Sequence, residues 1–168
     1  SAVRRSSIEL GKRFWQYQFS KAGYYYYSEH FLYNNSIEAI LETSSYGALL
    51  HKNESGVVQK LVFALEKSGY HPGVIFDANA GYKLFDRYLD DAPLAHALGL
   101  PEDQVLVSPK GQPADVFLLN AARDMAAPIV TNDRFRDWLD DFPEFAKPGR
   151  LIQGGYRKGA PYLKTNSD

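Results

Sequence analysis

The chain has 168 residues, of which 45% are hydrophobic and 23% charged, and this favours one globular domain and excludes disorder of the whole chain. The formal net charge is −1, from 19 basic and 20 acidic residues, so a nucleic-acid partner would have to be met by a local basic patch. There is no cysteine, which excludes disulfides and thiolate ligands, so any metal ion must be held by oxygen or imidazole.

The first residues of the chain are both basic and aromatic. Residues 1–36 contain five Lys/Arg against two Glu, and aromatic residues are interleaved with these charges. Such a segment can follow phosphates and stack on bases. The rings could equally pack on the domain or in a dimer contact. We therefore expect a basic aromatic N-terminal arm at 1–35, a domain at 36–160 and a C-terminal tail at 161–168.

From residue 36 onward, β-prone runs alternate with amphipathic helical stretches, a pattern typical of a parallel sheet covered by helices. Helices are recognised by apolar residues at a spacing of three and four, and strands by short buried-type runs. In chain order we expect a strand at 39–41, a helix at 57–67, a strand at 74–76, a helix at 88–98, a strand at 105–107, a helix at 114–125, a strand at 129–131, a helix at 133–140 and a strand at 151–152.

Acidic residues follow the predicted strands, at the edge where open α/β sheets bind ligands. Asp77 ends the second strand, Asp133 ends the fourth, and Asp115 lies in the first turn of the third helix. Asp137 follows Asp133 by four residues, which places both on one face of the predicted fourth helix. Grouped carboxylates repel one another unless a cation such as Mg²⁺ or Mn²⁺ neutralises them. A metal site is therefore predicted, although each acid by itself also suits a helix start or a solvated surface.

Three stretches of the sequence resemble a known family. Residues 129–137 read Ile-Val-Thr-Asn-Asp-Arg-Phe-Arg-Asp, similar to the strand and (S/T)-N-D-x-(F/Y)-R-D motif of the NYN branch of the PIN-like ribonucleases, which includes the Regnase-type enzymes. Residues 114–118 resemble the acidic helix start of this family, and residues 73–81 resemble the second strand of its bacterial members. The resemblance covers roughly residues 37–156 and implies a PIN-like three-layer α/β sandwich, with a mostly parallel sheet of about five strands and helices on both faces.

The resemblance also implies a metal-dependent endoribonuclease that acts on single-stranded RNA with Mg²⁺ or Mn²⁺. RNA is the expected partner, and a homodimer is left open. The implied catalytic and metal-binding residues are Asp77, Asp115, Asp133, Asp137 and Glu42. The implied RNA-binding residues are Asn132, Lys110, Arg134 and Arg136, with surface solvation as the alternative for each cation.

One position departs from the family pattern. The first strand of the family ends in Asp-Gly-x-Asn, whereas this chain has Glu42 in place of the aspartate and Ser45 in place of the asparagine. Glu42 is still an oxygen ligand, but its longer arm moves the carboxylate, and it could instead be an ordinary charge at a strand edge. The main alternative function is therefore a PIN-like module that binds RNA or a protein and has lost its activity.

Other classes of protein fit the sequence less well. A haloacid-dehalogenase phosphatase would need an aspartate where Asn79 stands, and a nucleotide-binding Rossmann protein would need a Gly-rich fingerprint after the first strand. No apolar run approaches the roughly 18 residues of a membrane-spanning helix, and no signal peptide is recognised. We therefore expect a cytoplasmic location and no membrane segment.

Overall fold

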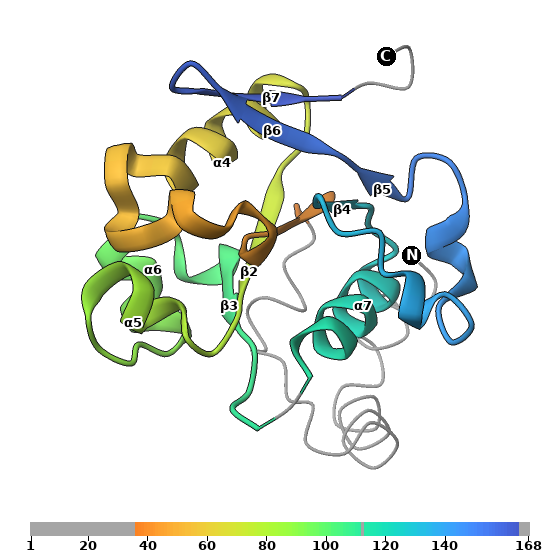
Figure 1. Cartoon of the computed structure of the whole chain (residues 1–168), viewed down its shortest axis with the longest axis horizontal. Coiled ribbons are helices and arrows are strands. Elements are labelled where there is room, and N and C mark those ends of the chain that lie inside the picture. The colour runs from red at the N-terminus through yellow and green to blue at the C-terminus, as the bar shows by residue number, and fades with distance from the viewer. Residues whose placement is uncertain (1–35, 112, 165–168) are drawn as a thin grey trace.

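The computed structural model describes residues 36–111 and 113–164, except the side chains at 48, 49 and 52–55. The predicted arm at 1–35 lies outside the described residues. At the centre is a sheet of five strands in the order β3-β2-β1-β4-β5, with every neighbouring pair parallel (Figure 1). The strands are β1 (Ala39–Glu42), β2 (Pro72–Phe76), β3 (Val105–Val107), β4 (Ile129–Val130) and β5 (Leu151–Ile152).

Side chains from the two faces of the sheet enter two separate hydrophobic clusters. Leu41, Val74 and Phe76 pack in one cluster, whereas their neighbours Ile40 and Ile75 pack in the other. Successive side chains of a strand point to opposite faces, so a parallel sheet covered on both sides needs apolar residues at every position. All residues of β1 to β4 are buried, and all of them except Glu42 at the end of β1 are apolar.

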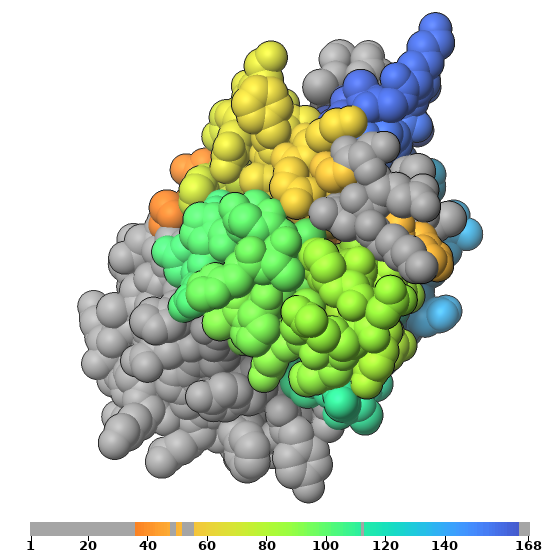
Figure 2. Space-filling view, turned by 90° about the vertical axis from the view of Figure 1, so that its left-hand side faces the viewer, coloured from red at the N-terminus to blue at the C-terminus, as the bar shows by residue number. Residues whose placement is uncertain are grey.

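Helices cover both faces of the sheet and complete a three-layer sandwich. In Figure 1, α7 lies on the opposite side of the sheet from α4, α5 and α6, and Figure 2 shows these three helices side by side on one surface. The first layer comprises the 3₁₀ segment η1 (Ser44–Gly56), α4 (Val57–Lys67), α5 (Ala80–Phe85) and α6 (Asp91–Leu98). The other layer comprises α7 (Ala114–Met125) and the 3₁₀ turns η3 (Arg136–Trp138) and η4 (Pro143–Ala146).

Two helices and the short strands predicted at 105–107 and 151–152 are confirmed, whereas other helical segments differ from the prediction. The helices predicted at 57–67 and 114–125 have the predicted bounds. The helix predicted at 88–98 begins only at Asp91, because the Asp90 carboxylate accepts the Asp91 N–H and caps it. The short helix α5 was missed: it has Gly81 inside it, where a Cβ would lie 2.4 Å from the Arg87 carbonyl oxygen. This glycine is required by packing, although it weakens the helical signal.

The prediction of a fourth helix at 133–140 is wrong. Only the turn η3 forms there, and Phe135 before it has a left-handed φ of 50°. The Asp133 Oδ1 atom accepts the Phe135 N–H at 2.8 Å, so an aspartate side chain replaces the first helical hydrogen bonds. Short polar side chains compete with helices in this way. The apolar spacing was still informative, because Phe135 is buried and Trp138 packs against the same cluster.

A hairpin that was not predicted from the sequence follows β5. The strands β6 (Gly154–Arg157) and β7 (Ala160–Leu163) are antiparallel, and their turn residues Lys158 and Gly159 both have positive φ, as in the tight turns that join hairpin strands. Tyr156 and Leu163 pack on the cluster that contains α4, so the hairpin continues the fold beyond residue 160. Within the part of the chain that the structure describes, no helix has the length and apolar character to cross a membrane.

Asp91 ties the start of α6 to the end of β3. Its Oδ1 atom accepts the Val107 N–H at 2.7 Å. Burial raises the pKa of Asp91 to about 6, although the bond from Val107 opposes this shift, and the neighbouring Asp90 raises the pKa further.

We expect this shifted pKa to make stability depend on pH. Because the pKa in the folded protein, about 6, exceeds the ordinary aspartate value of 3.8, the contribution of Asp91 to stability is present below 3.8 and is lost as the pH rises through 6. Asp91→Asn keeps an acceptor for Val107 and removes the buried charge. It should raise the melting temperature more at pH 8 than at pH 5. The exposed control Asp140→Asn should show no such difference, and an equal gain at both values would contradict the assignment.

Candidate active site

The order of the strands creates a switch point between β1 and β4. The chain passes from β1 to β2 and β3 on one side and then returns to form β4 on the other side. Ligands bind beyond the carboxyl ends of the strands at such a point. Glu42 ends β1, while Asp77 and Thr131 directly follow β2 and β4. Each lies two residues after an isoleucine of the cluster around α7, so the three side chains share that face.

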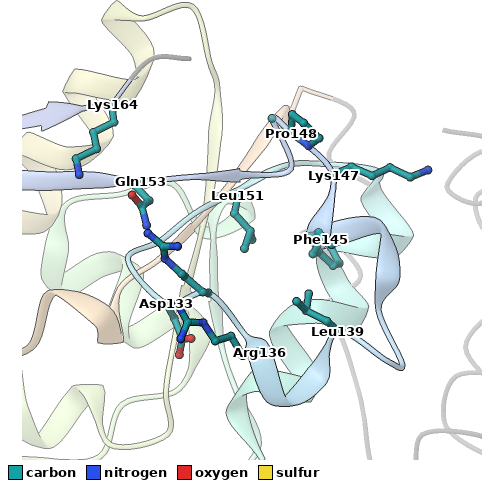
Figure 3. Close-up of a pocket in the computed structure, with 12 residues that line it drawn as sticks. Asp133, Arg136, Leu139, Phe145, Lys147, Pro148, Leu151, Gln153 and Lys164 are labelled. Carbon is teal, nitrogen blue, oxygen red and sulfur yellow. The ribbon is translucent and has the colours of Figure 1, made fainter. Parts of the chain in front are cut away.

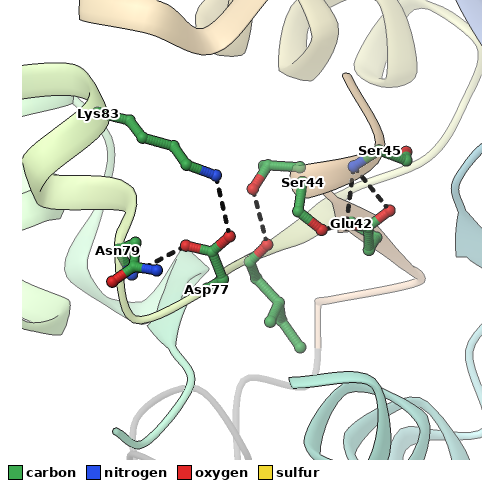
Figure 4. A network of polar contacts seen from close by, with 8 residues as sticks. Glu42, Ser44, Ser45, Asp77, Asn79 and Lys83 are labelled. Carbon is green, nitrogen blue, oxygen red and sulfur yellow. Dashed lines mark hydrogen bonds and ion pairs between the residues drawn. The ribbon is translucent and has the colours of Figure 1, made fainter. Parts of the chain in front are cut away.

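Glu42 is held by hydrogen bonds from three neighbouring residues. Glu42 is only 6% exposed. Its carboxylate accepts hydrogen bonds from the Ser44 hydroxyl, from the Ser45 N–H at 3.0 Å and from the Thr131 hydroxyl at 2.8 Å. Figure 4 shows Glu42 beside Ser44 and Ser45. Because Thr131 lies directly after β4 and the serines begin η1, Glu42 joins two segments that are distant in the sequence. We call these contacts the Glu42 network.

The residues after β4 extend this network toward Asp133. The Thr131 Oγ1 atom accepts the Asp133 N–H at 3.0 Å while it donates to Glu42. The Asn132 N–H donates to Ser45 Oγ at 3.1 Å, and Asn132 Oδ1 accepts the Gly154 N–H at 3.3 Å. The loop that carries Asp133 is thereby fixed both to β1 and to the hairpin. The Asn132 side chain was predicted to contact RNA, and in the structure its Oδ1 atom accepts the hydrogen bond from Gly154.

Asp77 is paired with a lysine of α5. The Asp77 Oδ2 atom lies 3.4 Å from the Lys83 ammonium, and its Oδ1 atom accepts the Asn79 N–H at 2.9 Å (Figure 4). The Lys83 side chain is 48% exposed, so water screens this ion pair and its contribution to stability is small. Lys83 nevertheless places one positive charge beside the acidic edge, and this charge was not predicted from the sequence.

Asp115 faces this edge from the first turn of α7. Its Oδ2 atom accepts the indole N–H of Trp138 at 3.3 Å. Burial raises the pKa of Asp115; the bond from Trp138 opposes the shift, and the negative charges of Asp133 and Glu42 raise the pKa further. The carboxylates of Glu42 and Asp133 therefore lie close enough to Asp115 to repel its negative charge.

A small hollow separates the acids at the ends of β1 and β2 from α7. Its volume is about 10 Å³, and Glu42, Asp77 and Asp115 are among the residues that line it. This space is close to that of one water molecule. No group of three acidic or histidine side chains that could together hold a metal ion is found within the described ranges. The donors fit a hydrated ion better than a closed protein cage, since Mg²⁺ usually keeps several waters and takes one or two carboxylates.

Asp137 is brought near Asp133 by a loop and not by a helix face. The two acids line an open cavity of about 610 Å³ together with Arg134 and Arg136. The predicted helical relation between the acids is wrong because the helix is absent, but both side chains border one space. The remaining predicted cation, Lys110, lies with its ammonium 3.8 Å from the ring centroid of Tyr88 and does not line this cavity.

Comparison with solved structures finds a similar fold in a protein-only RNase P. Arabidopsis thaliana nuclear protein-only RNase P 2 (PRORP2) matches with a TM-score of 0.59 and 18% identity, over 98% of this chain and 36% of that chain. A crystal structure of nuclear proteinaceous RNase P 2 from A. thaliana matches with a TM-score of 0.55 and 16% identity, over 98% of this chain and 34% of that chain. This chain shares the fold of the part of these proteins that it matches. It spans about a third of the length of these proteins.

At this level of identity, the likeness concerns the fold alone. The five-stranded parallel sheet between helical layers confirms the predicted three-layer α/β architecture. A scan against protein-family models finds no match, and a search of curated proteins finds none either. The Regnase-type affiliation therefore stays a prediction.

Proposed function

We propose that the protein is a metal-dependent endoribonuclease that hydrolyses single-stranded RNA. The observation that carries the proposal is the convergence of Glu42, Asp77, Asp115 and Asp133 at the switch point of a PIN-like sheet, next to an open cavity with two arginines. The likeness of the fold to protein-only RNase P supports RNA as the substrate class. A cytoplasmic location is part of the same proposal.

The carboxylates differ in how free they are to bind a metal ion. Asp115 and Asp133 each use one oxygen in the hydrogen bonds to Trp138 and Phe135, which leaves the other oxygen for a ligand. Both oxygens of Glu42 and of Asp77 already have protein partners. We therefore assign direct binding of Mg²⁺ or Mn²⁺ first to Asp115 and Asp133. Asp77, Asp137 and Glu42 complete the acidic surroundings.

The protein groups around this site have separate tasks. Arg134 and Arg136 line the open cavity beside Asp133, where they hold the phosphate backbone of the RNA by charge-assisted hydrogen bonds. The Glu42 network fixes the loop that carries Asp133. A divalent ion held by Asp115 and Asp133 would lower the pKa of its bound water and offset negative charge on the phosphate. Attack of this water on the phosphorus would break its bond to the 3′ oxygen, which leaves and takes up a proton, so the products would have 5′-phosphate and 3′-hydroxyl ends.

The proposal is tested by incubating the protein with end-labelled single-stranded RNA in Mn²⁺, in Mg²⁺ and in EDTA. We expect cleavage with either metal and none in EDTA, with 5′-phosphate ends on the new fragments. A duplex of the same sequence serves as the matched substrate control and should be cleaved more slowly. Intact RNA under all metal conditions, with a folded protein, would exclude the nuclease.

A binding module without activity is the second candidate. It is favoured by one observation: both oxygens of Glu42 and of Asp77 have hydrogen-bond or ion-pair partners in the protein, so these two carboxylates are stabilised without a metal ion. Titration calorimetry with Mn²⁺ separates the two candidates. The nuclease requires metal binding that is lost in Asp133→Asn, whereas the binding module requires none.

A further inference from the structure

A second, larger cavity lies beside Asp133 on the β5 side of the sheet. Its volume is about 650 Å³, and it is bordered by the segment from η3 to η4, by β5 and by Lys164 (Figure 3). It shares Asp133, Arg134 and Arg136 with the open cavity that also contains Asp137. A ligand that extends from Asp133 can therefore continue into it.

The border of this cavity is rich in positive charge. Four cations, Arg134, Arg136, Lys147 and Lys164, line it against the single acid Asp133. None of the four is in an ion pair with another residue of the described ranges. In Figure 3, Lys164 stands across the cavity from Lys147, whose ammonium points outward at the far rim. Cations on both sides of a cavity attract an anionic ligand that passes between them.

The position of Lys164 is set by the hairpin. The Lys164 N–H donates to the Gln153 carbonyl oxygen at 2.8 Å, which brings the end of β7 back to the residue that follows β5. Gln153 and Lys164 thus enter the same cavity from segments joined by the turn of the hairpin. Lys164 could not be identified from the sequence, because it lies in the stretch expected to be a tail.

The wall of the cavity between these charges is apolar. Leu139, Phe145 and Leu151 line it, and Figure 3 shows their side chains between the two lysines. An apolar wall can contact a base or sugar while the cationic rim contacts phosphates. The volume lies in the range of roughly 300 to 1,000 Å³ that is typical of ligand pockets.

We infer that this cavity binds the nucleotide next to the scissile phosphate, with Lys164 and Lys147 holding the phosphates of the departing strand. The inference rests on the proposed function and specifies the path of the bound RNA. The strand would run from Asp133 across β5 toward the hairpin of β6 and β7. Binding in this cavity uses charge and shape and needs no divalent ion.

The test is the double variant Lys147→Glu/Lys164→Glu of the full chain. Binding of fluorescent single-stranded RNA is measured by anisotropy in EDTA, at a series of salt concentrations, so that cleavage does not interfere. We expect affinity to fall at least about tenfold, and the slope of log K against log salt to decrease by about 0.7 for each phosphate that the variant no longer neutralises. The matched control is Lys60→Glu/Lys67→Glu, with the same charge change on α4 in the opposite layer. It should bind within about twofold of the parent protein.

The outcomes separate this inference from the proposed function. Equal weakening in both double variants would show an effect of net charge only and overturn the inference, as would unchanged binding in Lys147→Glu/Lys164→Glu. Loss of RNA binding in this variant alone supports the cavity even if the parent protein cleaves no RNA. Metal-dependent cleavage by the parent protein, with unchanged RNA affinity in the variant, would support the nuclease activity and contradict RNA binding in the cavity. Thermal melting of each variant checks the fold, and Lys147→Gln/Lys164→Gln repeats the test without new negative charge.

Discussion

Asp133→Asn is expected to abolish metal-dependent RNA cleavage and to leave the fold intact. Asp133 borders both open cavities and has a carboxylate oxygen that no described hydrogen bond uses. The asparagine oxygen still accepts the Phe135 N–H, whereas the charge that would bind the cation is removed. A metal ion contributes several kcal/mol to stabilisation of a phosphoryl transition state. We therefore expect the rate to fall at least about a hundredfold, since each 1.36 kcal/mol changes a rate tenfold.

Single-turnover cleavage with Mn²⁺ measures this effect, and thermal melting measures stability. The melting temperature should be unchanged or higher, because the substitution removes the repulsion between Asp133 and Asp115. Asp140→Asn is the matched control, since Asp140 lies outside both cavities. Cleavage by Asp133→Asn at the parental rate would mean that Asp133 is no ligand.

Glu42→Ala is expected to destabilise the protein and to stop cleavage as a consequence. The substitution leaves the Ser44 hydroxyl, the Ser45 N–H and the buried Thr131 hydroxyl without their acceptor. An unsatisfied buried polar group costs about 1–3 kcal/mol, so we expect a loss of roughly 2–4 kcal/mol in the free energy of unfolding. For a protein of this size the melting temperature should fall by about 5–15 °C. Glu38→Ala, an exposed glutamate just before β1, is the control and should melt like the parent protein.

Two further substitutions distinguish an anchoring role of Glu42 from a ligand role. Glu42→Gln keeps the length of the side chain and an acceptor oxygen, so it should recover part of the stability that Glu42→Ala loses. Glu42→Asp restores the aspartate of the family pattern but shortens the reach to Thr131. If Glu42 anchors the loop, Glu42→Asp lowers both the melting temperature and the rate. A higher Mg²⁺-supported rate in Glu42→Asp would instead identify position 42 as a metal ligand.

The sequence by itself determined the elements whose signal is local. The helices at Val57–Lys67 and Ala114–Met125 repeat apolar residues at helical spacing over several turns. The strand Val105–Val107 is a short apolar run next to a turn. Because Asp77 directly follows one predicted strand and Asp133 comes soon after another, the sequence also predicted that both acids would lie at the carboxyl edge of the sheet. These predictions need only the periodicity of each element and the parallel arrangement that alternating elements favour.

The tertiary structure decided which of these groups meet and how they are paired. Glu42 and Thr131 are separated by 89 positions, and they are hydrogen-bonded only because β4 joins the sheet beside β1. The predicted fourth helix does not form, because the Asp133 side chain accepts the Phe135 N–H and so competes with the backbone hydrogen bonds of a helix. Apolar spacing does not reveal this competition. Lys164 reached the cavity beside Asp133 through the pairing of a hairpin. Contacts of this kind depend on strand order and loop geometry, which arise from the packing of the whole domain and not from the pattern of any one segment.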